Sequence, residues 1–332
     1  MSINVSFHAV SEDQPGEKWQ AIFNRSWPGY RAWYLRSGAV GRPSYLESRR
    51  AIREHMPELV PTWERLVGLA GGGDVEARFL SLWCPPPYIA GCAQAVWIDP
   101  AGTQEPVLLR NYDFAPALLE GDWMATRWTD PRNRVLAMGD CLWGALDGVN
   151  EAGLSASLSF GGRTVTGAGF GIPLVLRYVL EVAHSTAEAI ALLQRVPVHM
   201  SYSVTLLDRS ADWATVFVAP DRATEVTRHK AVTNFQHAVE WPEHARATHS
   251  PQRLAALQQQ IDQRAPLQAL ADALLRAPLY QSSWLRGYGT LYSALYRPLS
   301  GQATLLWPGD SWAQSVTTFE EGQRKVVYPA YT

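Results

Sequence analysis

Three consecutive prolines, Pro85, Pro86 and Pro87, constrain the folding of this 332-residue chain more than any other sequence feature. A proline ring fixes φ and removes a backbone hydrogen-bond donor, so the run excludes both a helix and a central strand. It delivers an extended segment to Gly91 and Cys92, which stand at the head of an apolar run. The prolines therefore divide the chain into two parts of different character.

The part before the prolines is predicted to be mostly helical. Residues 45–56 are rich in charged helix formers, and residues 59–69 repeat apolar side chains at spacings of three and four. Gly71, Gly72 and Gly73 end that pattern.

The part after the prolines contains groups of predicted strands separated by predicted helices. Short apolar runs between turns predict strands at 92–98, 106–113, 134–138 and 153–160. Pro173 suits the first turn of one helix, and Ser185 with Glu188 forms a capping box at the start of a second. More strands, two more helices and three final strands follow. Because the strands come in groups, the order favours a layered α+β sandwich over a doubly wound sheet.

Charge and composition exclude several classes of protein. The chain has 29 basic and 31 acidic residues, so it has no excess positive charge for nucleic acid or an anionic membrane. No run approaches the ~18 apolar residues of a membrane span, and no signal peptide is recognisable, so we expect a cytoplasmic protein. Three cysteines without a CxxC pair and eight histidines without a zinc-binding pattern predict no disulfide framework and no metal site.

Two short segments near the start of the second part could carry chemistry. Cys92 places a thiol at the head of a strand, although a lone cysteine is more often buried and inert. Arg110 and Asp113 end an apolar strand with opposite charges, which must be paired or functional if they are buried. Residues three apart point to opposite faces of a regular strand, so a shared site requires a turn or bulge after Asn111.

Two later segments can likewise be interpreted as functional or as purely structural. Residues 148–154, GVNEAGL, form a polar sequence between apolar runs, which is typical of a hairpin turn. Asn234 ends a predicted strand, where its amide could donate to a developing oxyanion, but an asparagine that caps a turn is commoner.

Together, the ordered segments GC, RNYD, DGVNEAGL and VTNFQ resemble the N-terminal-nucleophile (Ntn) cysteine hydrolases. The sequence is most similar to the acyl-coenzyme A:6-aminopenicillanic acid acyltransferase family, to which the choloylglycine hydrolases and penicillin V acylases are related. Further similar segments extend the resemblance over about residues 56–298.

This resemblance implies a four-layer αββα sandwich and a precursor that cuts itself between Gly91 and Cys92. The released α-amine, with an ordinary pKa of ~7.7–8.0, would then serve as the base for the thiol, so that no histidine is needed. A glycine before the cut would tolerate the strained backbone that the attack requires. Residues 1–91 would become a small, mostly helical chain and residues 92–332 the catalytic core, packed as one globular domain.

The resemblance also implies roles for individual side chains. Asp113 would hold the α-amino group, Arg110 would lie beside the thiolate, and Asn234 would donate into the oxyanion hole. Arg253 matches a later arginine of the family. We assign substrate binding to three further residues, Asn150, Ser159 and Trp143. Ser159 stands where the bile-salt branch has an asparagine, which argues against a bile-salt substrate.

The function implied is a self-cleaving amidohydrolase or acyltransferase that acts on a small-molecule amide or thioester through an acyl-Cys92 thioester. It would need no cofactor, although a coenzyme A thioester could be a substrate. The sequence is also compatible with a homo-oligomer. One alternative is a Cys–His hydrolase without self-cleavage, in which Cys92 pairs with a distant histidine such as His199 or His237. The other is an inactive Ntn fold that acts as a binding protein. The absence of a papain-type motif argues against the first alternative, and the intact charged residues argue against the second.

Overall fold

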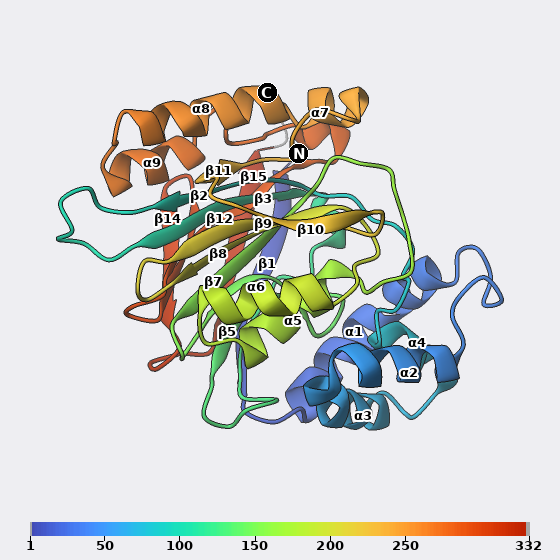
Figure 1. Cartoon of the computed structure of the whole chain (residues 1–332). Helices are drawn as coiled ribbons and strands as arrows, with labels where there is room; N and C mark the ends of the chain where they lie inside the picture. The colour runs from blue at the N-terminus through green and yellow to red at the C-terminus, as the bar shows by residue number, and fades with distance from the viewer. Residues whose placement is uncertain (1, 330–332) are drawn as a thin grey trace.

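The computed structural model describes residues 2–329 and contains two sheets packed face to face, each covered by helices on its outer side (Figure 1). Three apolar clusters fill the spaces between the four layers. The expected α+β class and the αββα order of layers are therefore confirmed. No helix within residues 2–329 is both long and apolar enough to cross a membrane.

The larger sheet has nine strands in the order β10-β9-β8-β7-β6-β5-β4-β1-β15. Its strands are β1 (Ser2–Glu12), β4 (Asp122–Thr126), β5 (Val135–Asp140), β6 (Gly144–Asn150), β7 (Leu154–Phe160), β8 (Tyr202–Asp208), β9 (Trp213–Ala219), β10 (Arg222–Thr227) and β15 (Gly322–Pro329). Its neighbouring strands are antiparallel except for the parallel pair β1 and β4.

The smaller sheet has six antiparallel strands in the order β11-β2-β3-β12-β13-β14. These strands are β2 (Gly91–Trp97), β3 (Val107–Phe114), β11 (Ala231–Val232), β12 (Gly289–Arg297), β13 (Gln302–Trp307) and β14 (Asp310–Ser315). The strands β2 and β3 are buried along almost their whole length, so the residues on them are held on all sides.

The helices fall into three groups. α5 (Ile172–Val182) and α6 (Thr186–Arg195) cover the nine-stranded sheet, and α8 (Ser250–Asp262) and α9 (Leu267–Leu274) cover the six-stranded sheet. The short α7 (Pro242–Ala247) precedes α8. A third group, α1 (Glu17–Tyr34), α2 (Tyr45–His55), α3 (Val60–Leu69) and α4 (Asp74–Leu80), lies beside the sandwich at the lower right of Figure 1. The Ser185 side chain accepts the Glu188 N–H, which confirms the predicted start of α6.

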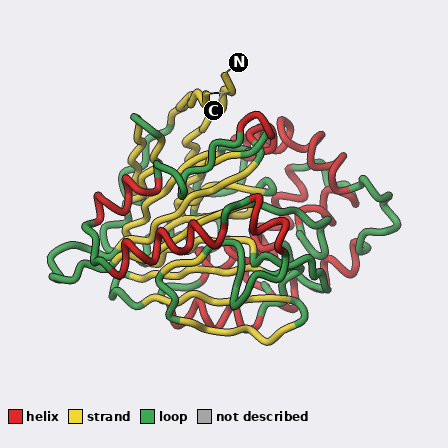
Figure 2. The backbone as a smooth tube through the Cα atoms, turned by 90° about the horizontal axis from the view of Figure 1, so that it is seen from above, coloured by secondary structure: helices red, strands yellow, loops and turns green. Residues whose placement is uncertain are grey.

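The N-terminal part differs from the expectation in one respect, because it begins with a strand. β1 lies between β4 and β15 inside the larger sheet, and Ser2 is paired with Pro329, so the two ends of the described chain lie side by side (Figure 2). Alternate residues Val5, Phe7 and Ala9 are buried. That spacing of two is the period of a half-buried strand, so the sequence did carry the signal.

Candidate active site

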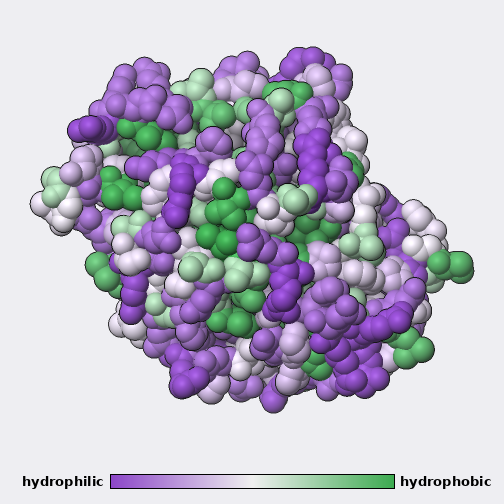
Figure 3. Space-filling model, in the orientation of Figure 1, coloured by the Kyte–Doolittle hydropathy of each residue, from purple (hydrophilic) through white to green (hydrophobic). Residues whose placement is uncertain are grey.

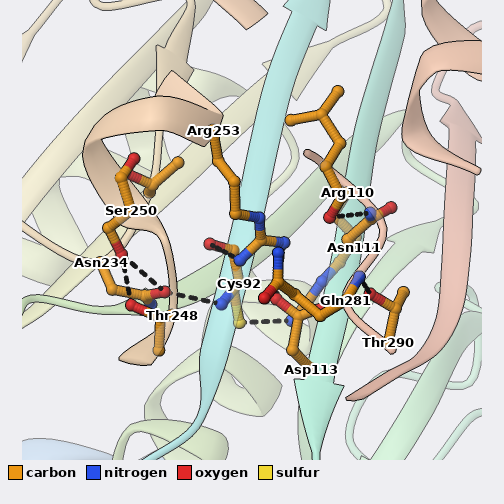
Figure 4. Close-up of polar contacts among 12 residues, drawn as sticks. Cys92, Arg110, Asn111, Asp113, Asn234, Thr248, Ser250, Arg253, Gln281 and Thr290 are labelled. Atoms are coloured by element: carbon orange, nitrogen blue, oxygen red, sulfur yellow. Dashed lines mark hydrogen bonds and ion pairs between the residues drawn. The ribbon is translucent and has the colours of Figure 1, made fainter. Parts of the chain in front are cut away.

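Cys92 is the second residue of β2, and its side chain lies in the apolar layer between the two sheets. It is 0% exposed, as are Arg110, Asp113 and Arg253, and Asn234 is 1% exposed. The structure therefore brings together all five residues predicted to be catalytic (Figure 4). The face of the molecule in Figure 3 is mostly polar with several small apolar groups, and the buried site takes no part in it.

The thiol is in direct contact with a guanidinium group. Arg110 Nη2 donates to Cys92 Sγ at 3.0 Å, and Nη1 forms an ion pair with Asp147 Oδ2 at 2.6 Å. Burial raises the pKa of the Cys92 thiol to about 11, although the positive charge of Arg110 acts in the opposite direction. In this environment the thiol is protonated at neutral pH and requires a base before it can act as a nucleophile.

Asp147 is a member of the site that the sequence analysis missed. It is fully buried on β6, where it accepts hydrogen bonds from the hydroxyls of Tyr292 and Tyr296 in addition to Arg110. A signal was present, because a lone carboxylate in a strand as apolar as residues 144–149 must find a partner. Its effect is to fix the Arg110 side chain against the thiol.

Asp113 and Arg253 form a second buried ion pair, with Oδ2 and Nη2 2.6 Å apart. The other carboxylate oxygen accepts the Thr290 hydroxyl at 2.6 Å, and Arg253 Nη1 donates to the Cys92 carbonyl oxygen at 3.4 Å. Thr290, at the start of β12, was also missed by the sequence analysis.

The irregularity expected after Asn111 lies on the neighbouring strand, because the register of β12 shifts between Thr290 and Tyr292, opposite Asp113 and Tyr112. β3 pairs with β2 in a regular register through Asp113, which lies opposite Gly91. Arg110 and Asp113 consequently project from opposite faces of β3. Arg110 reaches Cys92 directly, by donating to the thiol. Asp113 is linked to Cys92 through Arg253, which pairs with Asp113 and donates to the Cys92 carbonyl oxygen.

Asn234 lies just after β11 and binds the nitrogen of Cys92. Its Oδ1 accepts the Cys92 N–H at 2.9 Å, and its Nδ2 donates to the Phe160 carbonyl at 3.3 Å. Toward Cys92 the amide is thus an acceptor in this structure, and its donor end faces Phe160. The Ser250 hydroxyl also donates to Asn234 Oδ1, at 3.5 Å.

The three residues assigned to substrate binding are not equally placed. Ser159 lies on β7 beside the site, where it donates to the Thr233 carbonyl and accepts from Gln94. Asn150 instead donates to the Leu180 and Ala183 carbonyls at the end of α5. Trp143 is buried in the cluster beneath the helices and donates to the Leu80 carbonyl. Among the described residues, neither Asn150 nor Trp143 bonds a member of the Cys92 network, and both contact the helices that cover the larger sheet or lie beside it.

The two histidines considered as partners of Cys92 are engaged elsewhere. His199 Nδ1 contacts the Gly167 carbonyl at 2.5 Å, and His237 pairs with Glu225 at 2.9 Å. Within residues 2–329, the side chains that bond Cys92 are Asn234 and the arginines. This geometry gives no support to a Cys–His pair.

Gly91 precedes the thiol, and the reason for a glycine is steric. Its φ is not among the positive values of the described chain, so a left-handed backbone is not what requires glycine here. A Cβ placed on Gly91 would instead lie 1.6 Å from the Tyr288 hydroxyl oxygen.

A mostly apolar cavity of about 290 Å³ lies near the end of β3. Its aromatic lining comes from Tyr30, Trp33, Tyr88 and Phe114, and the Phe114 ring is 5.8 Å from that of Tyr112, the residue opposite Cys92. Glu120 and Asp140 lie in the wall of the same cavity. Trp143 does not line it.

Sequence comparison identifies one family. The family model described as "Acyl-coenzyme A:6-aminopenicillanic acid acyl-transferase" matches residues 100–312, which is well over half of the chain. No match was found among curated proteins.

Several solved structures are similar at low sequence identity. Penicillin V acylase from Agrobacterium tumefaciens is 16% identical, with a TM-score of 0.44 over 68% of this chain and 86% of that one. The N-acylethanolamine-hydrolyzing acid amidase ortholog of Caenorhabditis elegans is 16% identical, with a TM-score of 0.46 over 63% and 93%. A mutant form of the conjugated bile acid hydrolase from Clostridium perfringens is 12% identical, with a TM-score of 0.41 over 70% and 96%.

Proposed function

The chain belongs to the acyl-coenzyme A:6-aminopenicillanic acid acyl-transferase family, and from this premise we propose that it is a self-cleaving cysteine amidohydrolase or acyltransferase. One observation carries the proposal. The thiol, the nitrogen and the carbonyl of Cys92 each bind a different buried side chain, namely Arg110, Asn234 and Arg253. Such convergence on one residue is expected of a reaction centre and not of an inert core cysteine.

The proposed cleavage takes place at the bond between Gly91 and Cys92. Sγ adds to the Gly91 carbonyl carbon, the carbon–nitrogen bond breaks, and the thiol proton ends on the Cys92 nitrogen. Water then hydrolyses the thioester, which leaves a carboxylate on Gly91 and a free thiol and α-amine on Cys92. Residues 1–91 and 92–332 would become the small and large chains.

After cleavage, Cys92 would carry both nucleophile and base. Its α-amine accepts the thiol proton, and the acyl group of a small-molecule amide or thioester is transferred to Sγ. Arg110 would stabilise the thiolate, and Asp113, held by Arg253 and Thr290, would orient the ammonium group that forms. Asn234 would donate into the oxyanion hole, a role that requires its Nδ2 to exchange the Phe160 carbonyl for the substrate oxygen.

The acceptor of the acyl group decides between the two activities. Water gives a hydrolase and an amine gives an acyltransferase, for which a coenzyme A thioester is a suitable acyl donor. The cavity lined by Tyr30, Trp33, Tyr88 and Phe114 has the size and apolar character of an acyl pocket. The reaction as proposed needs no cofactor, and we place the protein in the cytoplasm.

Intact-mass spectrometry tests the self-cleavage directly. We expect the wild-type chain of 36.9 kDa to yield fragments of ~10 and ~27 kDa. Cys92→Ala should remain full length, whereas Cys141→Ala, the matched control at another buried cysteine, should be cut. A wild-type chain that stays whole, or a Cys92→Ala chain that is cut, would contradict the proposal.

A further inference from the structure

Tyr288 lies against the residue that precedes Cys92 and has no role in the network described above. It comes just before β12, and its hydroxyl oxygen is buried without a hydrogen-bond partner in the described structure. A Cβ on Gly91 would lie 1.6 Å from this oxygen, 3.0 Å from the Tyr288 Cζ and 3.3 Å from the Asp113 Cβ. The Gly91 α-carbon is therefore enclosed between two side chains that leave room for hydrogen alone.

The enclosing side chains cannot move aside without cost. Two atoms of the Tyr288 ring system come within 3.0 Å of the added carbon, so a small rotation of the hydroxyl does not relieve the clash. On the other side, Asp113 is fixed by its ion pair with Arg253 and by the Thr290 hydroxyl. Interiors packed this closely resist the addition of a methyl group.

We propose that Tyr288 is a specificity-determining residue of the self-cleavage. It makes glycine obligatory before the cut, because any side chain at residue 91 would meet its hydroxyl oxygen. This inference rests on the proposed self-cleavage between Gly91 and Cys92 and names the residue that restricts the acyl side of that bond.

A double-variant experiment tests the effect on cleavage. Gly91→Ala should slow self-cleavage roughly tenfold to a hundredfold, from the overpacking that it creates. Adding Tyr288→Ala should restore most of that rate because it removes the obstructing ring. Adding Tyr280→Ala should not, because the nearest atoms to the added carbon belong to Tyr288 and Asp113 and not to that tyrosine. Time courses by intact mass, on samples shown to be folded by circular dichroism, give the rates.

The outcomes separate this inference from the proposed function. A Gly91→Ala chain that is cut at the wild-type rate overturns the role of Tyr288, as does a folded Gly91→Ala/Tyr288→Ala chain that is no faster than Gly91→Ala. A wild-type chain that is never cut overturns the self-cleavage on which the inference rests. Rescue that Tyr280→Ala produces equally well also counts against Tyr288.

Discussion

The charged side chains around Cys92 form two buried ion pairs, and these lie on opposite faces of β3. Arg110, paired with Asp147, donates to the thiol. Arg253, paired with Asp113, donates to the carbonyl oxygen. A buried pair is costly to break because the remaining charge stays desolvated. Substitutions at these positions should therefore affect both stability and chemistry, and a test must separate the two.

The pH dependence of processing makes that separation for Arg110. Arg110→Met removes the charge that lowers the thiol pKa, so the thiol should ionise only at higher pH and the rise of the cleavage rate should move to more alkaline pH. The rate at each pH is measured by intact mass. Arg110→Lys keeps the charge and should restore part of the shift.

Arg177→Met is the matched control for this prediction. Arg177 is equally buried and pairs with Glu181 at 2.5 Å, away from the site. Both methionine variants should lose roughly 3–5 kcal/mol of unfolding free energy, since each leaves a carboxylate unpaired. A pH profile that is the same in both variants would show that Arg110 acts only through stability.

At this scale the sequence predicted residue types better than their contacts. The gathering of Cys92, Arg110, Asp113 and Arg253 followed from ordered short motifs, but the geometry did not. Tyr288 and Thr290 come from a segment nearly two hundred residues after Cys92, and only the pairing of β3 with β12 brings them beside Gly91. Local patterns carry no information on such a pairing.

Among the secondary-structure elements, the hairpin of β6 and β7 was predicted correctly, and the structure shows what its asparagine contacts. The turn at residues 151–153 is confirmed. The asparagine before it, Asn150, ties this turn to the end of α5 through the Leu180 and Ala183 carbonyls. Asn150 thus joins the sheet to the helix layer, and we expect its main role to be structural.

Asn150→Ala should consequently destabilise the fold without altering the chemistry. Losing both donated bonds leaves the Ala183 carbonyl without this partner, while the Leu180 carbonyl keeps the Asn133 amide, so the unfolding free energy should fall by about 1–3 kcal/mol. Urea unfolding measures this loss. The cleavage rate of the folded protein should not change, whereas Asn234→Ala should slow cleavage. Slow cleavage by folded Asn150→Ala would contradict this purely structural role.

For the molecule as a whole, burial of acidic groups in the cavity wall should make stability depend on pH. Burial, followed by the charges of Asp140 and Asp122, raises the pKa of Glu120 from 4.5 to about 8. The folded chain then binds more protons than the unfolded chain between these two values. The unfolding free energy should fall as the pH rises through this window, by an amount on the order of 2–4 kcal/mol.

Glu120→Gln tests this expectation because its amide cannot ionise. Urea unfolding at several values across the window should show a steep fall for the wild type and a flatter one for Glu120→Gln. Glu243→Gln, at an exposed position on α7, should behave as the wild type. Identical slopes in all three proteins would mean that Glu120 is ionised at neutral pH in the folded chain.

The layered architecture itself was predictable, because grouped strands and amphipathic helices leave few ways to bury their apolar faces. The place of the N-terminal segment was not. Its membership of the larger sheet depends on pairing with β4 and with β15, the latter more than three hundred residues away.

That middle position of β1 has a practical consequence for anyone who expresses this protein. If the chain is cut after Gly91, the N-terminal fragment stays bound because its β1 is hydrogen-bonded to β4 and β15. It should then behave as a permanent subunit. A shortened gene that starts at Cys92 would lack β1 and expose the edges of β4 and β15 that pair with it. Unpaired strand edges promote aggregation. Inclusion bodies, and not a ready-made mature enzyme, are what such a gene should deliver.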